Sequence, residues 1–380
     1  MSGQNQQPPM NQQYAPQIPP SFQNNDEIDL RELFKALWDG KVTIIAVTFI
    51  FAVGAVIYAL TAKEWWSSTA KVSQAQPQDI SAYQQQVRQF QPVFDIYQED
   101  GTILVSKELD DLVDTNVLFL RFIEAFNSSN NKRDFLDSSA EFQAFKAKLD
   151  ADADADADAD ATRRLYSLWF SKISAQASDK KSNSSPYDVS FQATTKDSSY
   201  SLLNAYINVI TKLSHQEALN NLQAMVDGKR NELVQQKKIL ETQAEYKVKV
   251  EAERAKYALE IAKAADVNQP IQTNSINEIF SIDLGTKALA AKVKALESVK
   301  DLNVVEPRLQ QINAKLAMLE TLEIDRSVQF QTFRFLENVE KPISRDKPKR
   351  ALIAVLGTLL GGMLGVAIVL VRFAFRREQD

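Results

Sequence analysis

Two long apolar stretches divide the chain into a short N-terminal segment, a large polar region and a short C-terminal segment. Val42–Ala62 and Ala351–Val371 contain no charged side chain. Each has about the 20 residues that a helix needs to cross the roughly 30 Å hydrocarbon core of a bilayer. Basic residues bound the two stretches: Lys41, Lys63, Arg350 and Arg372. We therefore predict transmembrane helices over residues 42–62 and 351–371.

Two other interpretations of these stretches are weaker. A cleaved signal peptide stands at the extreme N-terminus behind a basic region, whereas residues 1–41 precede the first stretch and their first basic residue is Arg31. A buried core helix is usually shorter and is not bounded by basic residues at both ends. Lysine and arginine are distributed evenly on the two sides of the spans, so the positive-inside rule does not decide the orientation.

The segment before the first span changes character near residue 26. Residues 1–25 are rich in glutamine, asparagine and proline and contain few large apolar side chains, so we predict a disordered tail. From Asp26, a plausible helix cap, apolar residues recur at helical spacing: Leu30, Leu33, Phe34 and Leu37. We predict an amphipathic juxtamembrane helix over 26–41 with Trp38 in an aromatic belt. This helix either lies on the membrane or packs against the tail of another subunit.

The polar region contains both strand and helix patterns near its two ends. Alternating or β-rich runs predict strands at Ser67–Gln74, Trp169–Ala177, Tyr187–Thr194 and Val328–Leu336. Apolar residues at helical spacing predict two amphipathic helices, over 113–126 and 135–145. We expect these elements to form an α/β base from residues 63–199 and 326–341.

A long helix is the main feature between the two parts of the base. From Tyr200 to about Ala265 the chain has no proline and its only glycine is Gly228, so a continuous helix would be on the order of 100 Å long. Asp197-Ser198-Ser199 is the predicted N-cap. Apolar repeats over 289–299 and 309–322 predict returning helices, which gives a helical hairpin over 200–325. The charged part of the long helix needs neighbours, either these returning helices or other subunits.

Six tandem Asp-Ala pairs occupy Asp150–Ala161. A cluster of carboxylates suggests Ca²⁺, which prefers several oxygen ligands. However, the repeat lacks the glycine turn and the mixed carbonyl and side-chain ligands of calcium loops. We interpret it as a solvated low-complexity insertion and predict no metal site.

Composition and motifs give no indication of catalysis. The chain has no cysteine, which excludes disulfides and thiolate metal sites, and its net charge of −5 does not favour nucleic acid. It contains neither a Walker-type phosphate loop, nor a dinucleotide fingerprint, nor a nucleophile elbow. The single histidine, His215, has no obvious partner and is interpreted as a packing or surface residue. We predict no catalytic residue and no cofactor.

The second apolar stretch carries a stripe of small residues. Gly357, Gly361 and Gly365 repeat every four residues and therefore share one face of a helix. Small residues at this spacing let two helix backbones approach closely in lipid. We predict that this face packs against the first span, a sister subunit or another membrane protein.

A stiff basic linker precedes the second span. It contains Pro342 and Pro348 and ends with Lys349 and Arg350. Proline fixes φ and resists helix formation, so we expect this juxtamembrane linker to set the direction in which the chain enters the span. Its basic side chains can contact lipid phosphates.

Three regions together resemble the Wzz-type chain length determinants, the polysaccharide co-polymerases of Gram-negative inner membranes. Asp26–Lys41 looks like the segment before the family's first span. Tyr187–Leu213 is similar to its central strand and helix start. The linker prolines and the glycines from Gly357 to Gly365 resemble its C-terminal motif. The Asp-Ala repeat and the long glutamine-rich tail depart from the family pattern.

The resemblance implies an α+β membrane protein in which two transmembrane helices flank a periplasmic α/β base domain with a long extended helical hairpin. The periplasmic domain would be 63–350, and both termini, including 372–380, would be cytoplasmic. The protein would form a ring-shaped homo-oligomer, for which we expect an octamer in the bilayer. A larger relative carries a tyrosine kinase after the second span, and the nine residues after Val371 provide none.

The function implied by the resemblance is non-catalytic regulation of O-antigen chain length together with a Wzy-type polymerase and possible contact with the growing glycan. Within the same class, the polymer could instead be enterobacterial common antigen or another Wzy-made glycan. A structural adaptor in polysaccharide export fits the same layout. A two-span sensor would need a cytoplasmic output domain, which residues 372–380 do not provide.

Overall fold

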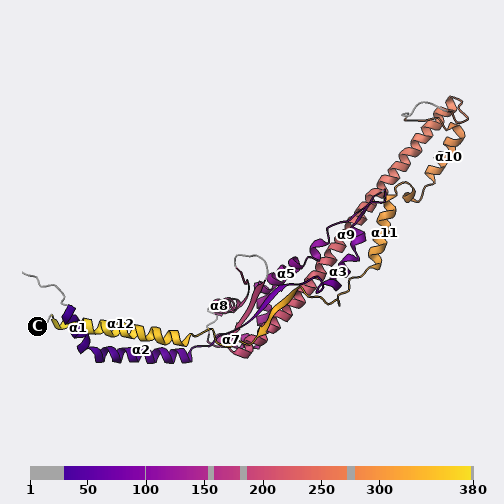
Figure 1. The fold of residues 1–380 in the computed structure, drawn as a ribbon. Coiled ribbons are helices and arrows are strands. Elements are labelled where there is room, and N and C mark those ends of the chain that lie inside the picture. Colours follow the sequence, from indigo (N-terminus) through magenta and orange to yellow (C-terminus); the bar gives the residue numbers. More distant parts are fainter. Residues whose placement is uncertain (1–29, 99, 153–157, 180–185, 272–278, 378–380) are drawn as a thin grey trace, which may run out of the picture. The chain divides into compact units, whose positions relative to one another are not determined.

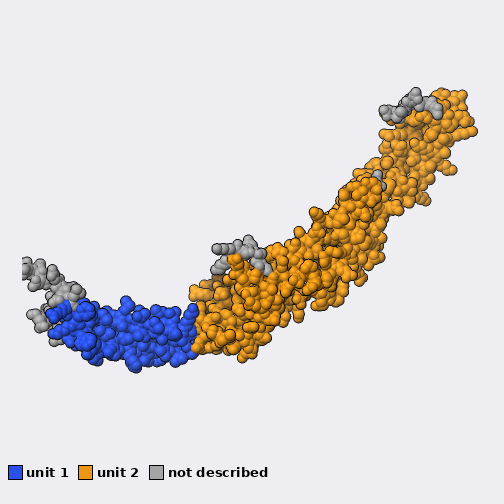
Figure 2. All heavy atoms as spheres, in the orientation of Figure 1, with its two compact units in different colours: residues 1–63, 348–380 blue, residues 64–347 orange. Residues whose placement is uncertain are grey.

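The computed structural model describes residues 30–98, 100–152, 158–179, 186–271 and 279–377 (Figure 1). The predicted tail, the predicted cap at Asp26 and the middle of the Asp-Ala repeat lie outside these residues. The chain forms two compact units (Figure 2): a helical unit from residues 1–63 and 348–380, and a central domain, Glu64–Lys347.

The helical unit contains three described helices. Helix α1 (Leu30–Asp39) is followed, after Gly40, by α2 (Lys41–Thr61), and α12 (Arg350–Arg377) lies alongside α2 (Figure 1). The parts of α2 and α12 that are long and apolar enough to cross a membrane are Lys41–Thr61 and Arg350–Phe375. Most of their side chains are exposed in the isolated chain, as expected for helices whose surroundings are lipid.

An antiparallel sheet joins the two ends of the central domain. Its strand order is β4 (Ile173–Ala177), β5 (Tyr187–Ala193), β1 (Trp66–Gln74) and β6 (Phe333–Glu340). Strand β5 buries every second side chain, with Val189, Phe191 and Ala193 all inaccessible to solvent. This alternation matches the period of two that a sheet with one covered face requires.

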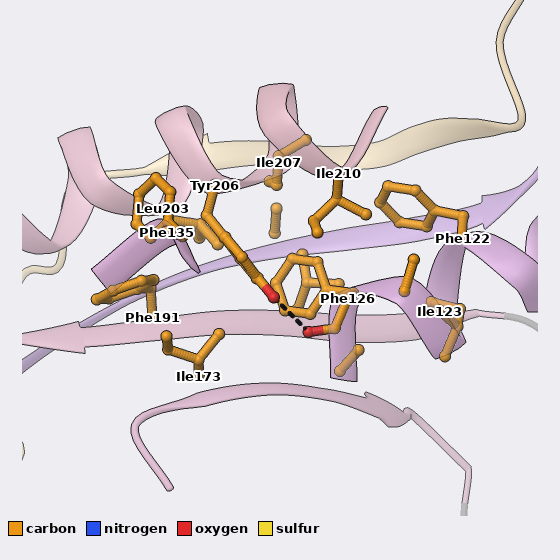
Figure 3. Packing of buried hydrophobic residues seen from close by; sticks show 14 of the residues in the cluster. Phe122, Ile123, Phe126, Phe135, Ile173, Phe191, Leu203, Tyr206, Ile207 and Ile210 are labelled. Atoms are coloured by element: carbon orange, nitrogen blue, oxygen red, sulfur yellow. Dashed lines mark hydrogen bonds between the residues drawn. The ribbon is translucent and has the colours of Figure 1, made fainter. Parts of the chain in front are cut away.

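Helices cover the buried face of the sheet. They are α5 (Thr115–Asn127), α6 (Ser129–Asp137), α7 (Ala140–Asp152), α8 (Asp158–Phe170) and the first turns of α9 (Lys196–Ala264). Aromatic rings dominate this core, and Figure 3 shows Tyr206 of α9 directed toward α5, where its hydroxyl donates a 2.8 Å hydrogen bond to the carbonyl of Phe126. A buried tyrosine hydroxyl needs such a partner because an unpaired polar atom is costly in an apolar core.

A second core lies further along α9. It gathers side chains from α3 (Ser81–Arg88), α4 (Gln91–Phe94), η1 (Asp110–Leu112) and α11 (Arg308–Thr321). A small hairpin of β2 (Ile96–Tyr97) and β3 (Ile103–Leu104) is attached here, and Asp95 holds its base by accepting a 3.0 Å hydrogen bond from the backbone N–H of Ser106.

The helical hairpin is built on α9, which is 69 residues long and therefore about 100 Å. The returning helices α10 (Gly285–Glu297) and α11 pack along it, with η2 (Leu302–Val304) between them (Figure 1). The predicted fold class is confirmed, because two long apolar helices flank an α/β base from which a long helical hairpin extends.

Three local predictions were wrong. Helix α9 is capped by Thr195, whose hydroxyl accepts from the N–H of Ser198 at 3.0 Å, and Asp197 lies inside the first turn. Trp169 belongs to α8 rather than to a strand, because it lies at helical spacing from Leu165 and packs into the core. The last strand begins only at Phe333.

Two further features of the base were not predicted. The single helix expected over 135–145 is interrupted at Ser138 and Ser139, where α6 ends before α7 begins. The β2–β3 hairpin was missed because its strands are only two residues long, too short for an alternating pattern to be visible.

Candidate functional site: the paired apolar helices and an exposed stripe on the long helix

The glycine face of α12 lies against α2 of the same chain. A Cβ atom built on Gly361 would lie 2.9 Å from the Cα of Thr48, and one built on Gly365 would lie 2.9 Å from the Cα of Ile44. A Cβ on Gly357 would overlap the side chain of Ala55. Of the three partners considered from the sequence, α2 is therefore the one seen in the structure. That the glycines are required for this packing remains a prediction.

The facing side of α2 is compatible with this close approach. The hydroxyl of Thr48 donates a 2.7 Å hydrogen bond to the carbonyl of Ile44 in its own helix. The polar group is thus satisfied within the helix, as an apolar environment requires. The two backbones approach each other without leaving this hydroxyl unpaired.

Arg350, the last residue of the predicted linker, contacts the end of α2. Its Nε atom donates a 3.2 Å hydrogen bond to the carbonyl of Ala59, which is one of the terminal carbonyls of the helix. A cation at a helix C-terminus interacts favourably with the helix dipole. Pro348 is half-buried and Lys349 is exposed. Arg350 therefore connects the start of α12 to the end of α2 through this hydrogen bond.

Within the central domain, the entering and leaving segments of the chain are tied together. The backbone N–H of Trp65 donates to the carbonyl of Lys347 at 3.0 Å, and Arg345 forms a 2.7 Å ion pair with Glu64. The carboxylate of Asp346 accepts a 2.9 Å hydrogen bond from Gln192 of β5. Residues 345–347 of the linker are thus held against the sheet, and Pro342 is half-buried.

The distal half of α9 exposes an apolar stripe. It consists of Ile239, Tyr246, Val250, Tyr257 and Ile261, whose exposed fractions lie between 44% and 64%. Their separations of seven, four, seven and four residues keep them within about 60° on the helix surface at 3.6 residues per turn. An 11-residue repeat of this kind stays nearly parallel to the helix axis. The stripe therefore forms one continuous exposed face.

A shallow hollow of about 420 Å³ lies on the same stripe. Its lining residues are Tyr246, Lys249, Val250, Glu253, Arg254, Tyr257, Ile279 and Phe280. Tyr257 and Phe280 meet edge to face with ring centroids 5.5 Å apart. The hollow is mainly apolar with charged residues at its margin, which suits a protein contact better than a small polar ligand.

The opposite side of the distal α9 is packed by the chain itself. Leu240, Ala244, Ala258 and Ala262 are buried, and Ala258 and Ala262 contact Leu289 of α10. Small side chains allow α10 to approach closely. Returning helices therefore cover one face of the long helix, as one of the two interpretations of the sequence expects. The stripe stays exposed, and its contact with another subunit remains a prediction.

Among the described residues, no group of three or more histidine, cysteine, aspartate or glutamate side chains is arranged to hold a metal ion. His215 stacks on Phe330 with ring centroids 4.4 Å apart. Burial lowers the pKa of His215, while a hydrogen bond involving the backbone of Phe330 opposes this change. The described histidine is therefore part of the packing in the second core.

Comparisons with known proteins agree over nearly the whole chain. The family "Chain length determinant protein" (Wzz) matches residues 26–114, and the "G-rich domain on putative tyrosine kinase" matches residues 307–374. A solved "full-length bacterial polysaccharide co-polymerase" is 25% identical, with a TM-score of 0.55, and the match covers 92% of this chain and 99% of that chain. The fold, with its two candidate spans, is thus similar to that of the polysaccharide co-polymerases.

Curated relatives are similar along nearly the whole chain. A "Chain length determinant protein" from Shigella dysenteriae is 28% identical over 360 residues, covering 94% of this chain and 96% of the relative. The "Ferric enterobactin transport protein FepE" of Escherichia coli (strain K12) is 28% identical over 379 residues, covering 97% and 95%. The chain is thus similar along nearly its whole length to the Wzz chain length determinant proteins.

Proposed function

We propose that this protein regulates the chain length of O-antigen polysaccharide as a non-catalytic oligomer that acts with a Wzy-type polymerase. The observation that carries the proposal is the end-to-end similarity to chain length determinant proteins, which includes both apolar helices and the central domain. The described residues gather no metal-ligand cluster, and their one histidine is used in packing. Non-catalytic action is part of the proposal, and its support is the similarity to chain length determinant proteins.

The proposed placement is an inner-membrane protein with the central domain in the periplasm and both termini in the cytoplasm. The two candidate spans support this layout, because an even number of crossings returns the chain to its starting side. Reporter fusions at the C-terminus test it: a cytoplasmic reporter such as green fluorescent protein should fluoresce there, and alkaline phosphatase should be inactive. The opposite pattern would refute the proposed topology.

The proposed assembly is a ring of identical subunits, with eight as the expected number. The apolar stripe of α9 supports assembly, since exposed apolar surfaces of this length are rarely left uncovered. Native mass measurement of the full-length protein in nanodiscs would give the subunit number directly.

A gene deletion in the source strain tests the function. Lipopolysaccharide from the deletion strain, separated on a gel, should lose its modal cluster of bands, and a plasmid copy should restore it. An unchanged ladder would exclude O-antigen and leave another Wzy-made glycan, such as enterobacterial common antigen, or an export adaptor. Co-purification with a polymerase or with an export channel separates these two outcomes.

One relative is named for ferric enterobactin transport, so iron uptake needs its own control. The deletion strain should grow normally with ferric enterobactin as its sole iron source. A growth defect without any change of the polysaccharide ladder would overturn the proposal in favour of transport.

A further inference from the structure

Helix α1 has an apolar face that the described residues leave partly uncovered. Leu33, Ala36 and Leu37 are partly buried on the side where α1 contacts α12. Phe34 and Trp38, one helical turn apart, are 72% and 71% exposed. The apolar arc of α1 is therefore wider than its contact with α12, and its uncovered part is aromatic.

The charges on α1 are sorted around this arc. At 100° per residue, Arg31 and Lys35 fall beside Phe34 and Trp38, and Asp39 falls further round, away from the apolar arc. Basic side chains at the margin of an apolar face are typical of helices that lie in a membrane surface, where they reach lipid phosphates. An acidic residue on the far side faces water in that orientation.

The helical unit places α1 at the end of the apolar spans. Only Gly40 separates α1 from α2, and a Cβ built on Gly40 would overlap Val369 of α12. Val369 lies three residues before the exposed Arg372, where the second apolar stretch ends. The uncovered aromatic pair is thus attached to the end of the paired candidate spans that carries Lys41 and Arg372.

Lys41 adds a cation at the same place. Its Nζ atom lies 4.8 Å from the centroid of the Trp38 ring. A cation–π contact keeps the ammonium group next to the aromatic ring, and tryptophan itself is enriched at the membrane–water interface. Trp38 and Lys41 together combine an interfacial aromatic ring with a group that binds phosphate.

We propose that α1 is a membrane-surface anchor that binds anionic phospholipids. Phe34 and Trp38 enter the boundary between headgroups and acyl chains, and Lys35 and Lys41 contact the lipid phosphates. This occupant is favoured over a second copy of the chain because α1 is continuous with the spans and its exposed margin is basic. The proposal rests on the candidate spans and is independent of O-antigen regulation.

The absence of cysteine makes a direct test possible in the full-length protein. Phe34→Cys and Asp39→Cys are spin-labelled separately and placed in nanodiscs of phosphatidylcholine, with or without phosphatidylglycerol. With phosphatidylglycerol present, the label at residue 34 should be relaxed by oxygen and shielded from a water-soluble nickel chelate. The label at residue 39 should show the reverse and is the matched control.

Charge reversal tests the headgroup contribution. Lys35→Glu combined with Lys41→Glu should abolish the extra shielding that phosphatidylglycerol gives at residue 34, while the size of the assembly stays unchanged. Equal exposure of both labels to the nickel chelate would overturn the proposal. Shielding from both relaxers together with spin–spin broadening between subunits would also overturn it and would show that a second copy covers this face.

Discussion

At the scale of single residues, buried aromatic side chains connect segments that are far apart in the sequence. The hydroxyl of Tyr83 donates a 3.1 Å hydrogen bond to the carbonyl of Ala218, and burial raises the pKa of Tyr83 to about 12. Phe330 stacks between Tyr83 and His215, with ring centroids 4.5 Å and 4.4 Å away. Because Phe330 packs in this stack, the segment before β6 does not pair with the sheet. The strand therefore begins later than the sequence pattern predicted.

The stack predicts a pH dependence of stability. The pKa of His215 in the folded chain lies below its ordinary value of 6.5, because burial disfavours the charged form. As the pH falls through 6.5, His215 therefore takes up a proton in the unfolded chain before it does so in the folded chain. The free energy of unfolding decreases in that range. We expect the melting temperature of the full-length protein in detergent to fall between about pH 7 and pH 5.

A variant separates this effect from acid denaturation in general. His215→Phe keeps a ring on Phe330 and should make the melting temperature nearly independent of pH in that window. Carboxyl groups whose pKa is lowered, such as Asp100 and Asp197, titrate below this pH range. They should therefore not contribute to the change of melting temperature in the variant or in the unmodified protein. If the melting temperature of the variant changes with pH as steeply as that of the unmodified protein, His215 is not the source of the pH dependence.

At the scale of elements, we predict that the pairing of α2 and α12 requires glycine, which has no Cβ atom, at the three positions of the stripe. The three glycines of the predicted stripe lie where α2 comes closest, whereas a Cβ on Gly54 of α2 would have no neighbour within 4 Å. The repeat itself was visible in the sequence. The identity of the partner was not, because every small-residue face has the same pattern whichever helix covers it.

Gly361→Ala is therefore expected to force α2 and α12 apart, since the new methyl group would meet the Thr48 backbone. Overpacking of this kind costs about 1–3 kcal/mol and should lower the melting temperature in detergent. Gly54→Ala is the matched control, because it adds the same methyl group in open space. The control should be neutral or stabilising by up to about 1 kcal/mol, since alanine favours helix.

The larger substitution Gly361→Leu extends the test to assembly and to polysaccharide length. Unchanged oligomer size and an unchanged lipopolysaccharide ladder would contradict a requirement for close packing of the second span. Equal melting temperatures for Gly361→Ala and Gly54→Ala would contradict the helix contact itself.

At the scale of the whole molecule, the faces of α9 have different uses. The core face of its first half holds the sheet and α5, its distal half receives α10 and α11, and the stripe from Ile239 to Ile261 stays exposed. The helix α9 extends well beyond the part that the core of its own chain covers. The exposed apolar part therefore needs partners outside the chain. The stripe is the surface that we assign to the neighbouring subunit.

Val250→Asp should weaken the proposed ring, because it places a charge in the centre of the stripe. Native mass measurement should show smaller assemblies, and the modal cluster of the lipopolysaccharide ladder should broaden. Asn231→Asp adds the same charge at an exposed position outside the stripe and should leave both unchanged. Full-sized rings of Val250→Asp would show that the subunits meet elsewhere.

The sequence by itself determined the features that depend on local pattern. Two runs without charge define the spans, and a stretch without proline defines α9, whose observed start at Lys196 and end at Ala264 lie close to the expected bounds. Hydrophobicity and helix propensity act over a few turns, so they can be evaluated without knowledge of the fold. The resemblance to a family then supplied the proposed orientation and the proposed function, which composition left open.

The tertiary structure alone decided which distant segments meet. It selected α2 as the partner of the glycines, Thr195 as the cap of α9 and the core position of Phe330, and it separated the covered face of α9 from the exposed stripe. Each choice depends on contacts between residues far apart in the chain. A periodic pattern shows that a face is apolar, but only the packed fold shows what covers it.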